Sequence, residues 1–331
     1  MSLPALRSLI VPCLAALIAA GTLAALIAAG TPARASEPVR IEGAEEIAFT
    51  AKASGEPFRL LLLRPDGEAP AGGWPVLYSF DGEDSFALLA DIARTLNGLA
   101  ARTGRSPVAV AAIAWPRGRA SVDRRVYDMT PPTARADGVH VMPERPNGRP
   151  WPKLGGGDAF LALIEDEMKP LVREALGGRT GPQTLFGHSL GGLMVLHRLV
   201  TDPDSFACYA ASSPSIWVDD RQILADLDRL LARPPAASAD APVPGLRVTV
   251  GGAEEEFGPQ DARAGEEVEA RRRWVANNAM VTNARALAGL VEEKGEGHLR
   301  FSYEEYEGRT HQTSRILAAL DAVQLAIDCT E

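Results

Sequence analysis

The residues best suited to chemistry lie in one short stretch, residues 187–191 (GHSLG), which has the Gly-x-Ser-x-Gly pattern. An apolar run at 183–186 precedes it, and a helical pattern at 193–200 follows. This setting is typical of a nucleophile elbow, in which a sharp strand-to-helix turn lifts a serine hydroxyl above the sheet. We expect the flanking glycines to be required, because such a turn leaves no room for neighbouring side chains. Ser189 is the predicted nucleophile, and the backbone N–H of Leu190 is one predicted oxyanion donor.

A serine hydroxyl needs a base that removes its proton, and histidine has that role most often. In chains with this type of elbow, the order along the sequence is serine, acid, histidine. His311 fits this order best, since it follows a strand-like run at 299–306 and precedes the last helical pattern at 314–327. The other histidines are expected in packing or in loops: His140, His188, His197 and His298.

The acid that orients the histidine should follow the strand-like run at 246–250, where residues 251–256 read GGAEEE. Glu254 lies nearest to the end of that strand and is the first candidate, and Glu256 is the second. The alternative is a solvated acidic loop beside a base that works without a carboxylate, because an orienting acid raises the rate but is not indispensable.

A second oxyanion donor is expected after the strand at 75–80, where residues 79–83 read SFDGE. Gly82 would permit a tight turn that aims the N–H of Glu83, or its own N–H, at the reaction intermediate. A plain Asp-Gly turn without a catalytic role is the alternative interpretation.

The elements that must position these groups alternate along the chain, with apolar runs followed by helical patterns. Strands separated by helices of this length predict a mostly parallel sheet with helices on both faces, the α/β class, in one domain over residues 36–331. One helix, at 159–176, should begin with Asp158 as its N-cap. Residues 116–157 are rich in Pro, Gly and Arg and lack periodicity, which favours a functional or partly disordered loop, including a lid. The predicted strands are 58–63, 75–80, 108–115, 183–186, 206–211, 246–250 and 299–306, and the predicted helices are 85–101, 159–176, 191–200, 223–232, 281–294 and 314–327.

The first 35 residues read as a targeting segment. Arg7 precedes an uncharged stretch at 9–30, and residues 33–35 (ARA) form a small-x-small site of the kind that signal peptidase cuts. The stretch is also long enough to span a bilayer, so a retained N-terminal anchor is the alternative to a cleaved signal peptide. Either way, the bulk of the chain is expected to be exported, in the periplasm or beyond, with membrane contact only through an uncleaved segment.

Composition and charge exclude several classes of protein. The 331 residues contain 34 Lys and Arg against 43 Asp and Glu, a net charge of −9, which disfavours a nucleic-acid binder. The five histidines lack the spacing of metal ligands, and serine–histidine ester hydrolysis needs no cofactor, so we expect neither a metal nor a cofactor. Export permits a disulfide between Cys208 and Cys329, but the sequence favours two unpaired thiols, one in a buried strand and one in the tail.

Several stretches, spread over most of the chain, carry a resemblance to a known family: residues 75–82, 125–131, 156–160 with Glu167 and Pro170, 187–192, 212–217 and 308–311. On them the sequence resembles the esterase-D-like branch of the α/β-hydrolases, and most closely the esterases that open trilactone siderophores of the enterobactin and salmochelin type. The resemblance implies the α/β-hydrolase fold, an exported serine esterase, an apo or ferric catecholate siderophore as substrate, and a cleft lined by Arg125 and Trp217.

The two cleft residues are chemically suited to a catecholate, which offers anionic oxygens to a guanidinium and flat rings to an indole. A structural salt bridge with Asp128 is the alternative for Arg125, and core packing is the alternative for Trp217. For the chain as a whole, the alternatives are a general carboxylesterase or acyltransferase acting on another ester or thioester, and a binding protein on a hydrolase scaffold.

Overall fold

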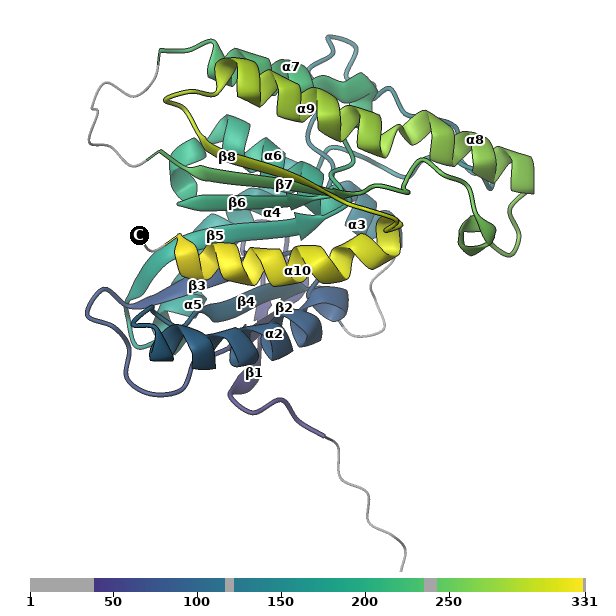
Figure 1. Cartoon of the computed structure of the whole chain (residues 1–331). Helices are drawn as coiled ribbons and strands as arrows, with labels where there is room; N and C mark the ends of the chain where they lie inside the picture. The colour runs from purple at the N-terminus through teal and green to yellow at the C-terminus, as the bar shows by residue number, and fades with distance from the viewer. Residues whose placement is uncertain (1–38, 117–121, 235–242, 330–331) are drawn as a thin grey trace, which may run out of the picture. The chain divides into compact units, whose positions relative to one another are not determined.

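The computed structural model describes residues 39–116, 122–234 and 243–329, and residues 41–331 form one compact unit. Its centre is an eight-stranded sheet in the order β1-β2-β4-β3-β5-β6-β7-β8 (Figure 1). The pairs β1–β2 and β2–β4 are antiparallel, and every other neighbouring pair is parallel. The strands are β1 (Ala44–Thr50), β2 (Pro57–Leu63), β3 (Trp74–Ser79), β4 (Ala109–Ala114), β5 (Thr180–His188), β6 (Cys208–Ser212), β7 (Gly245–Gly251) and β8 (Arg300–Tyr306).

The hydrophobicity of a strand explains whether it could be predicted from the sequence. Every residue of β3 and β4 is buried, as expected for central strands covered on both faces, and both lie where the apolar runs predict them. The edge strand β1 was not predicted from the sequence. It carries Glu45 and Glu46 on its exposed positions, and this polar edge lacks a continuous apolar run.

Helices cover the two faces of the sheet, as predicted. One apolar core lies between the sheet, α2 and α10, and a second lies on the opposite face under α4, α6, α7 and α9. The helices are α2 (Gly82–Arg102), α3 (Val122–Asp128), α4 (Gly157–Leu163), α5 (Lys169–Ala175), α6 (Leu190–Thr201), α7 (Gln222–Leu231), α8 (Val268–Asn278), α9 (Met280–Lys294) and α10 (His311–Asp328).

The helix predicted at 159–176 differs from the structure in two respects. It consists of α4 and α5 joined by a π-helical turn, Ile164–Met168. Its N-cap is Gly156, so the prediction of Asp158 as the cap is wrong. Asp158 lies within the first turn, and its carboxylate is 2.6 Å from Nε2 of His197 instead of accepting from the helix backbone.

Helix α8 was missed, as was α3 within the irregular stretch at 116–157. The sequence of α8, VEARRRWVANN, is mostly polar, and its buried residues are Arg271, Val275 and Asn278. Apolar periodicity is therefore weak, and a capping glutamate, Glu267, starts the helix by accepting hydrogen bonds from the N–H groups of Glu269 and Ala270. Figure 1 shows α8 end to end with α9, at the side of the sheet where the parallel strands end.

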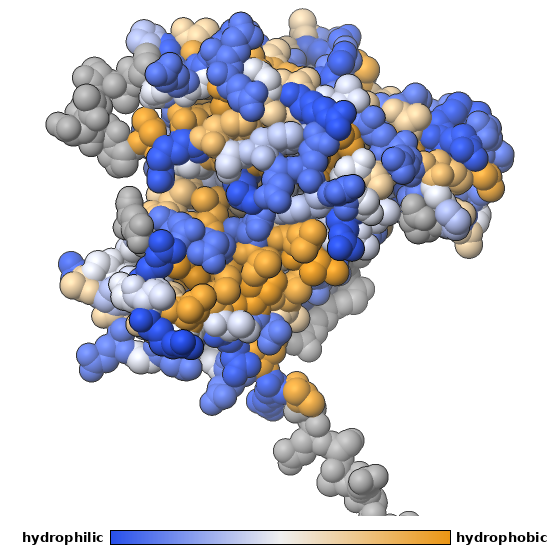
Figure 2. All heavy atoms as spheres, viewed as in Figure 1, coloured by the Kyte–Doolittle hydropathy of each residue, from blue (hydrophilic) through white to orange (hydrophobic). Residues whose placement is uncertain are grey.

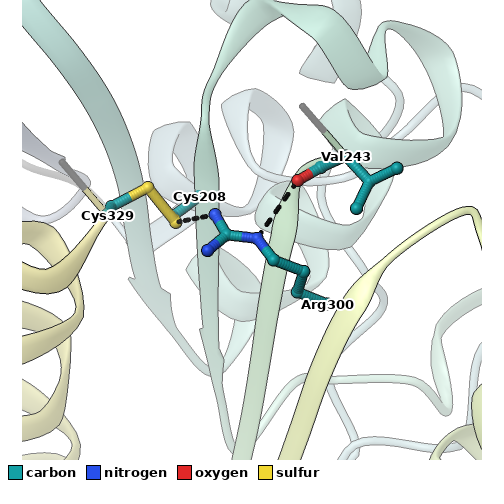
Figure 3. The surroundings of a disulfide bond; sticks show 4 residues. All are labelled: Cys208, Val243, Arg300 and Cys329. Atoms are coloured by element: carbon teal, nitrogen blue, oxygen red, sulfur yellow. Dashed lines mark hydrogen bonds between the residues drawn. A yellow bond between two sulfur atoms is a disulfide. The ribbon is translucent and has the colours of Figure 1, made fainter. Parts of the chain in front are cut away.

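Cys208 and Cys329 form a disulfide, so the prediction of two unpaired thiols is wrong (Figure 3). Their Cα atoms are 6.3 Å apart although 121 positions separate them in sequence. The start of β6 and the end of α10 become neighbours only when α10 packs across the sheet, which no local pattern reveals. Arg300 lies beside the bridge, with Nη2 3.8 Å from Sγ of Cys208 and Nε donating to the carbonyl of Val243.

Apolar side chains also reach the surface over α2 and α10 (Figure 2). Leu99, Ile316 and Leu320 are the large exposed members of this face. Within the described ranges, no helix is both long and apolar enough to cross a membrane. The predicted targeting segment, residues 1–35, lies outside the described residues.

Candidate active site

Ser189 occupies the sharp turn between β5 and α6, with a strained backbone of φ 62° and ψ −119°. A Cβ on Gly187 would lie 2.3 Å from the backbone of Gly191, and one on Gly192 would lie 2.7 Å from the carbonyl oxygen of Ser212. Both glycines are therefore required by close backbone approach. Gly191 is different, because a Cβ there would meet only ordinary van der Waals contacts, so the expectation that it is needed for space is wrong.

The predicted base lies at the first residue of α10, directly after the N-cap Thr310. Nε2 of His311 is 3.0 Å from Oγ of Ser189, and Nδ1 is 2.6 Å from Oε2 of Glu254. The structure thus brings together three side chains from the ends of β5 and β7 and from the start of α10. A nucleophile, a base and an orienting carboxylate have this connectivity in serine hydrolases.

Glu254 is held in a turn after β7, and its side chain is fully buried. Its Oε1 accepts from Oγ of Ser213 at 2.5 Å and from the N–H of Gly251 at 2.7 Å, and Ser314 donates from 3.2 Å. Burial raises the pKa of this carboxyl. The hydrogen bond and the charge of His311, together with the hydrogen bonds from Ser213 and Gly251, outweigh burial and leave the pKa below its usual value.

The other acid candidate does not join this cluster. Glu256 is exposed, and His311 has no contact with it in the described structure. No role was predicted from the sequence for the two supporting hydroxyls, on Ser213 and Ser314. Ser213 has a left-handed backbone, φ 41°, and its side chain donates to the carboxylate of Glu254. Such a backbone conformation at a serine cannot be predicted from the sequence.

His188 lies beside the base and not in remote packing. It is half-buried, with Nε2 of its ring shielded from solvent; its ring centroid is 4.5 Å from that of His311, and its Nδ1 is 3.0 Å from Oγ of Ser212. Burial, together with the nearby charge of His311, lowers the pKa of His188 well below its usual value, so the ring stays neutral. A neutral ring adds no positive charge next to the imidazolium that His311 would form during catalysis.

The two predicted donor segments lie at two helix N-termini. Leu190 is the first residue of α6, and Gly82 is the first residue of α2, where N–H groups lack acceptors within the helix. The residue in the left-handed conformation is Asp81, with φ 52°, and not Gly82. Gly82 is required for a different reason: a Cβ there would lie 2.9 Å from the carbonyl oxygen of Ile113. The side chain of Glu83 lies 3.5 Å from the guanidinium of Arg59.

Arg125 is paired with Asp81, so the alternative of a salt bridge with Asp128 is wrong. Nε and Nη2 of Arg125 donate to the two carboxylate oxygens of Asp81 at 2.5 and 2.7 Å. The carboxylate of Asp128 instead accepts from Nε of Arg124 at 2.6 Å and from the indole of Trp115 at 2.9 Å.

A cavity of about 480 Å³ opens beside these groups, lined by Ser189, His311, Arg125 and Trp217 among others. Trp217 is half-buried and contacts two further indoles, those of Trp151 and Trp274, at centroid distances of 6.0 and 5.3 Å. Sequence reasoning named Arg125 and Trp217 but missed the α8 residues of this cavity, because α8 itself was not predicted. Among the described residues, no group of three His, Cys, Asp or Glu side chains could hold a metal ion.

Comparison with known families decides the class of the chain. The profile of the family described as "Putative esterase" matches residues 51–314, most of the sequence. The chain belongs to this family of carboxylic ester hydrolases. The match includes Ser189 and His311, together with Glu254 between them.

Individual known proteins show how far the similarity extends. The chain is 33% identical over 192 residues to the ferri-bacillibactin esterase BesA of Bacillus subtilis, covering 58% of this chain and 65% of that enzyme, just under two thirds. It is 33% identical over 231 residues to the siderophore enterobactin esterase of Emericella nidulans, covering 69% and 74%. The solved structure of siderophore hydrolase EstA from Aspergillus nidulans superposes with a TM-score of 0.75 at 26% identity, covering 90% and 99%. The predicted α/β-hydrolase architecture is therefore confirmed.

Proposed function

We propose that this esterase hydrolyses the ester bonds of a trilactone catecholate siderophore through an acyl-enzyme on Ser189. The observation that carries the proposal is the hydrogen-bonded chain from Ser189 through His311 to the buried Glu254 at the wall of a cavity. The siderophore substrates named for the Bacillus and Emericella relatives support the choice of substrate.

In the first half-reaction, Oγ of Ser189 bonds to the ester carbonyl carbon, and Nε2 of His311 takes the hydroxyl proton. Glu254 holds the Nδ1 side of the ring and stabilises the imidazolium. The N–H of Leu190, with that of Gly82 or Glu83, would donate to the oxyanion. When the carbonyl–alkoxide bond breaks, His311 returns the proton to the leaving alcohol.

In the second half-reaction, water attacks the acyl-enzyme, and His311 takes a proton from that water. Collapse of the second tetrahedral intermediate releases the carboxylic acid and returns the proton to Oγ of Ser189. A trilactone carries three such esters, so successive turnovers would give a linear trimer, then dimer and monomer.

We further propose that residues 1–35 direct export, either as a cleaved signal peptide or as a retained anchor. The uncharged stretch at 9–30 and the small-x-small site at 33–35 support this assignment.

The deciding experiment uses protein that lacks residues 1–35, incubated with apo- and ferric enterobactin and analysed by mass spectrometry. We expect linear trimer, dimer and monomer from the wild type and none from Ser189→Ala. Hydrolysis of p-nitrophenyl butyrate alone would retain the serine esterase and discard the siderophore substrate. The general carboxylesterase or acyltransferase is the alternative that this result would favour.

A further inference from the structure

One wall of the cavity comes from residues 261–278, which follow the acidic loop at 251–256 and for which the sequence predicts no role. We define the α8 wall as Asp261, Arg263, Arg271, Trp274 and Asn278, all of which line the cavity that contains Ser189 and His311. The last three residues belong to α8, Asp261 ends a short 3-10 helix (Pro259–Asp261), and Arg263 lies between the two helices.

The α8 wall places two guanidinium groups near each other. Arg263 is exposed, and its side chain makes no hydrogen bond or ion pair with any described residue. Arg271 is buried, with Nε 3.3 Å from the carbonyl oxygen of Asp261 and 3.8 Å from a carboxylate oxygen of Glu266. Burial lowers the pKa of Arg271, and the charge of Arg263 lowers it further, while Glu266 and Asp261 act in the opposite direction. Among the described residues, the positive charge of Arg263 is thus left without a direct partner at the cavity.

The indoles of Trp217 and Trp274 line the same cavity as these two cations. Trp274 packs edge-on against Trp217, with ring centroids 5.3 Å apart, and Trp151 lies 5.9 Å from Trp274. The three indoles come from α8, from the turn after β6 and from the long loop before α4. Indole faces and guanidinium groups side by side suit a ligand that is both flat and anionic.

A polar atom of the wall also lacks a partner. Asn278 is buried and lines the cavity, and its Oδ1 accepts no hydrogen bond within the described structure. A buried amide oxygen without a donor is costly, so a bound N–H or O–H group would be favourable here. The amide N–H groups that link aromatic acids to a trilactone ring are donors of this kind.

We infer that the α8 wall recognises the metal-loaded form of the catecholate substrate and makes the enzyme prefer it over the metal-free form. The inference rests on the proposed function. Free catechols keep most of their hydroxyl protons at neutral pH and are uncharged, whereas coordination to Fe³⁺ removes those protons and leaves the whole complex negatively charged. The unpaired guanidinium of Arg263 therefore favours the ferric complex, while the indoles contact the aromatic rings in both forms.

The test compares Arg263→Gln with a matched control, Arg273→Gln, which changes an exposed arginine on α8 that does not line the cavity. kcat/KM is measured on ferric and on apo-enterobactin by product analysis over a range of NaCl concentrations. We expect the wild type to prefer the ferric form, and Arg263→Gln to reduce that preference about tenfold, the size of one charge-assisted contact. The preference should also decrease with salt in the wild type and less so in Arg263→Gln. Arg273→Gln should keep the wild-type preference.

Two results would overturn the inference while leaving the proposed function in place. One is a wild type that cleaves apo-enterobactin as fast as the ferric complex. The other is an Arg263→Gln enzyme whose preference equals that of the wild type and of Arg273→Gln. If the wild type cleaves neither form but hydrolyses p-nitrophenyl butyrate, the proposed substrate itself is wrong, and the three failures are thus distinguishable.

Discussion

Arg125 holds the carboxylate of Asp81 with two parallel hydrogen bonds of 2.5 and 2.7 Å. Asp81 has a left-handed backbone and directly precedes Gly82, the first residue of α2. The pair therefore fixes the loop from which we expect the second oxyanion donor. Arg125 also lines the cavity, so one guanidinium contacts both the loop and the space for substrate.

Loss of the Arg125–Asp81 pair should lower kcat for a small ester more than it weakens binding of that ester. Arg125→Lys keeps the charge but cannot form the bidentate contact, so the loop before Gly82 is held less firmly. We expect kcat on p-nitrophenyl butyrate to fall about tenfold, because a single oxyanion donor contributes about 2.7–4 kcal/mol and would be displaced only in part. The measurement is steady-state kinetics of Arg125→Lys, Asp81→Asn and the double variant. Additive effects of the two single changes would show that the pair does not act as a unit.

Glu254 should be far more important for turnover than its near neighbour Glu256. Glu254→Gln keeps the size of the side chain but removes the carboxylate that accepts from Nδ1 of His311, and we expect kcat to fall by about 10⁴-fold. Glu256→Gln is the matched control, and its kcat should equal that of the wild type. Equal activity of the two variants would instead favour a serine–histidine dyad.

The buried ring of His188 predicts an acid-sensitive fold. Burial lowers its pKa below the usual value of 6.5, so below pH 6.5 the unfolded chain binds a proton at this position that the native state does not bind. Stability contributed by the neutral ring is thus present above pH 6.5 and is lost as the pH falls below it, by up to about 1.4 kcal/mol per pH unit.

His188→Asn tests this expectation, since the amide can still bond to Ser212 but does not titrate. The free energy of unfolding from urea titrations should depend less on pH below 6.5 in His188→Asn than in the wild type. His298→Asn, a change far from the buried ring in sequence and outside the site, serves as the control and should retain the wild-type slope. An unchanged slope in His188→Asn would contradict the prediction.

The disulfide should stabilise the fold without taking part in catalysis. Closing a loop of 121 residues stabilises a chain by about 4–5 kcal/mol in the loop-entropy model, so Cys329→Ser should lose up to that amount. Helix α10 also packs through Ala318, Ala322 and Val323, so kcat of the folded variant at 25 °C should stay near the wild-type value. Guanidinium denaturation with and without reductant provides the check. Reductant should shift the wild-type midpoint and leave that of Cys329→Ser unchanged.

The sequence by itself determined the elements whose signals are local. The Gly-x-Ser-x-Gly turn lies between a strand and a helix as predicted, and the buried strands β3 and β4 follow from their apolar runs. The order of Ser189, Glu254 and His311 along the chain agreed with the side chains that the structure brings together. The turn and the two strands could be predicted because each depends on residues close in sequence. The three catalytic candidates could be predicted because chains with this type of elbow place serine, acid and histidine in a constant order.

Only the tertiary structure decided the features that depend on distant neighbours. Ser213 and Ser314 donate hydrogen bonds to Glu254, from which they are separated by 41 and 60 positions in sequence. Arg125 pairs with Asp81, although Asp128 is much nearer in sequence. Cys208 meets Cys329 because α10 runs back across the sheet. The polar helix α8 gives no periodic signal, yet it supplies a wall of the cavity. In each case the contact depends on how helices and strands pack against one another, and local residue patterns do not encode that packing.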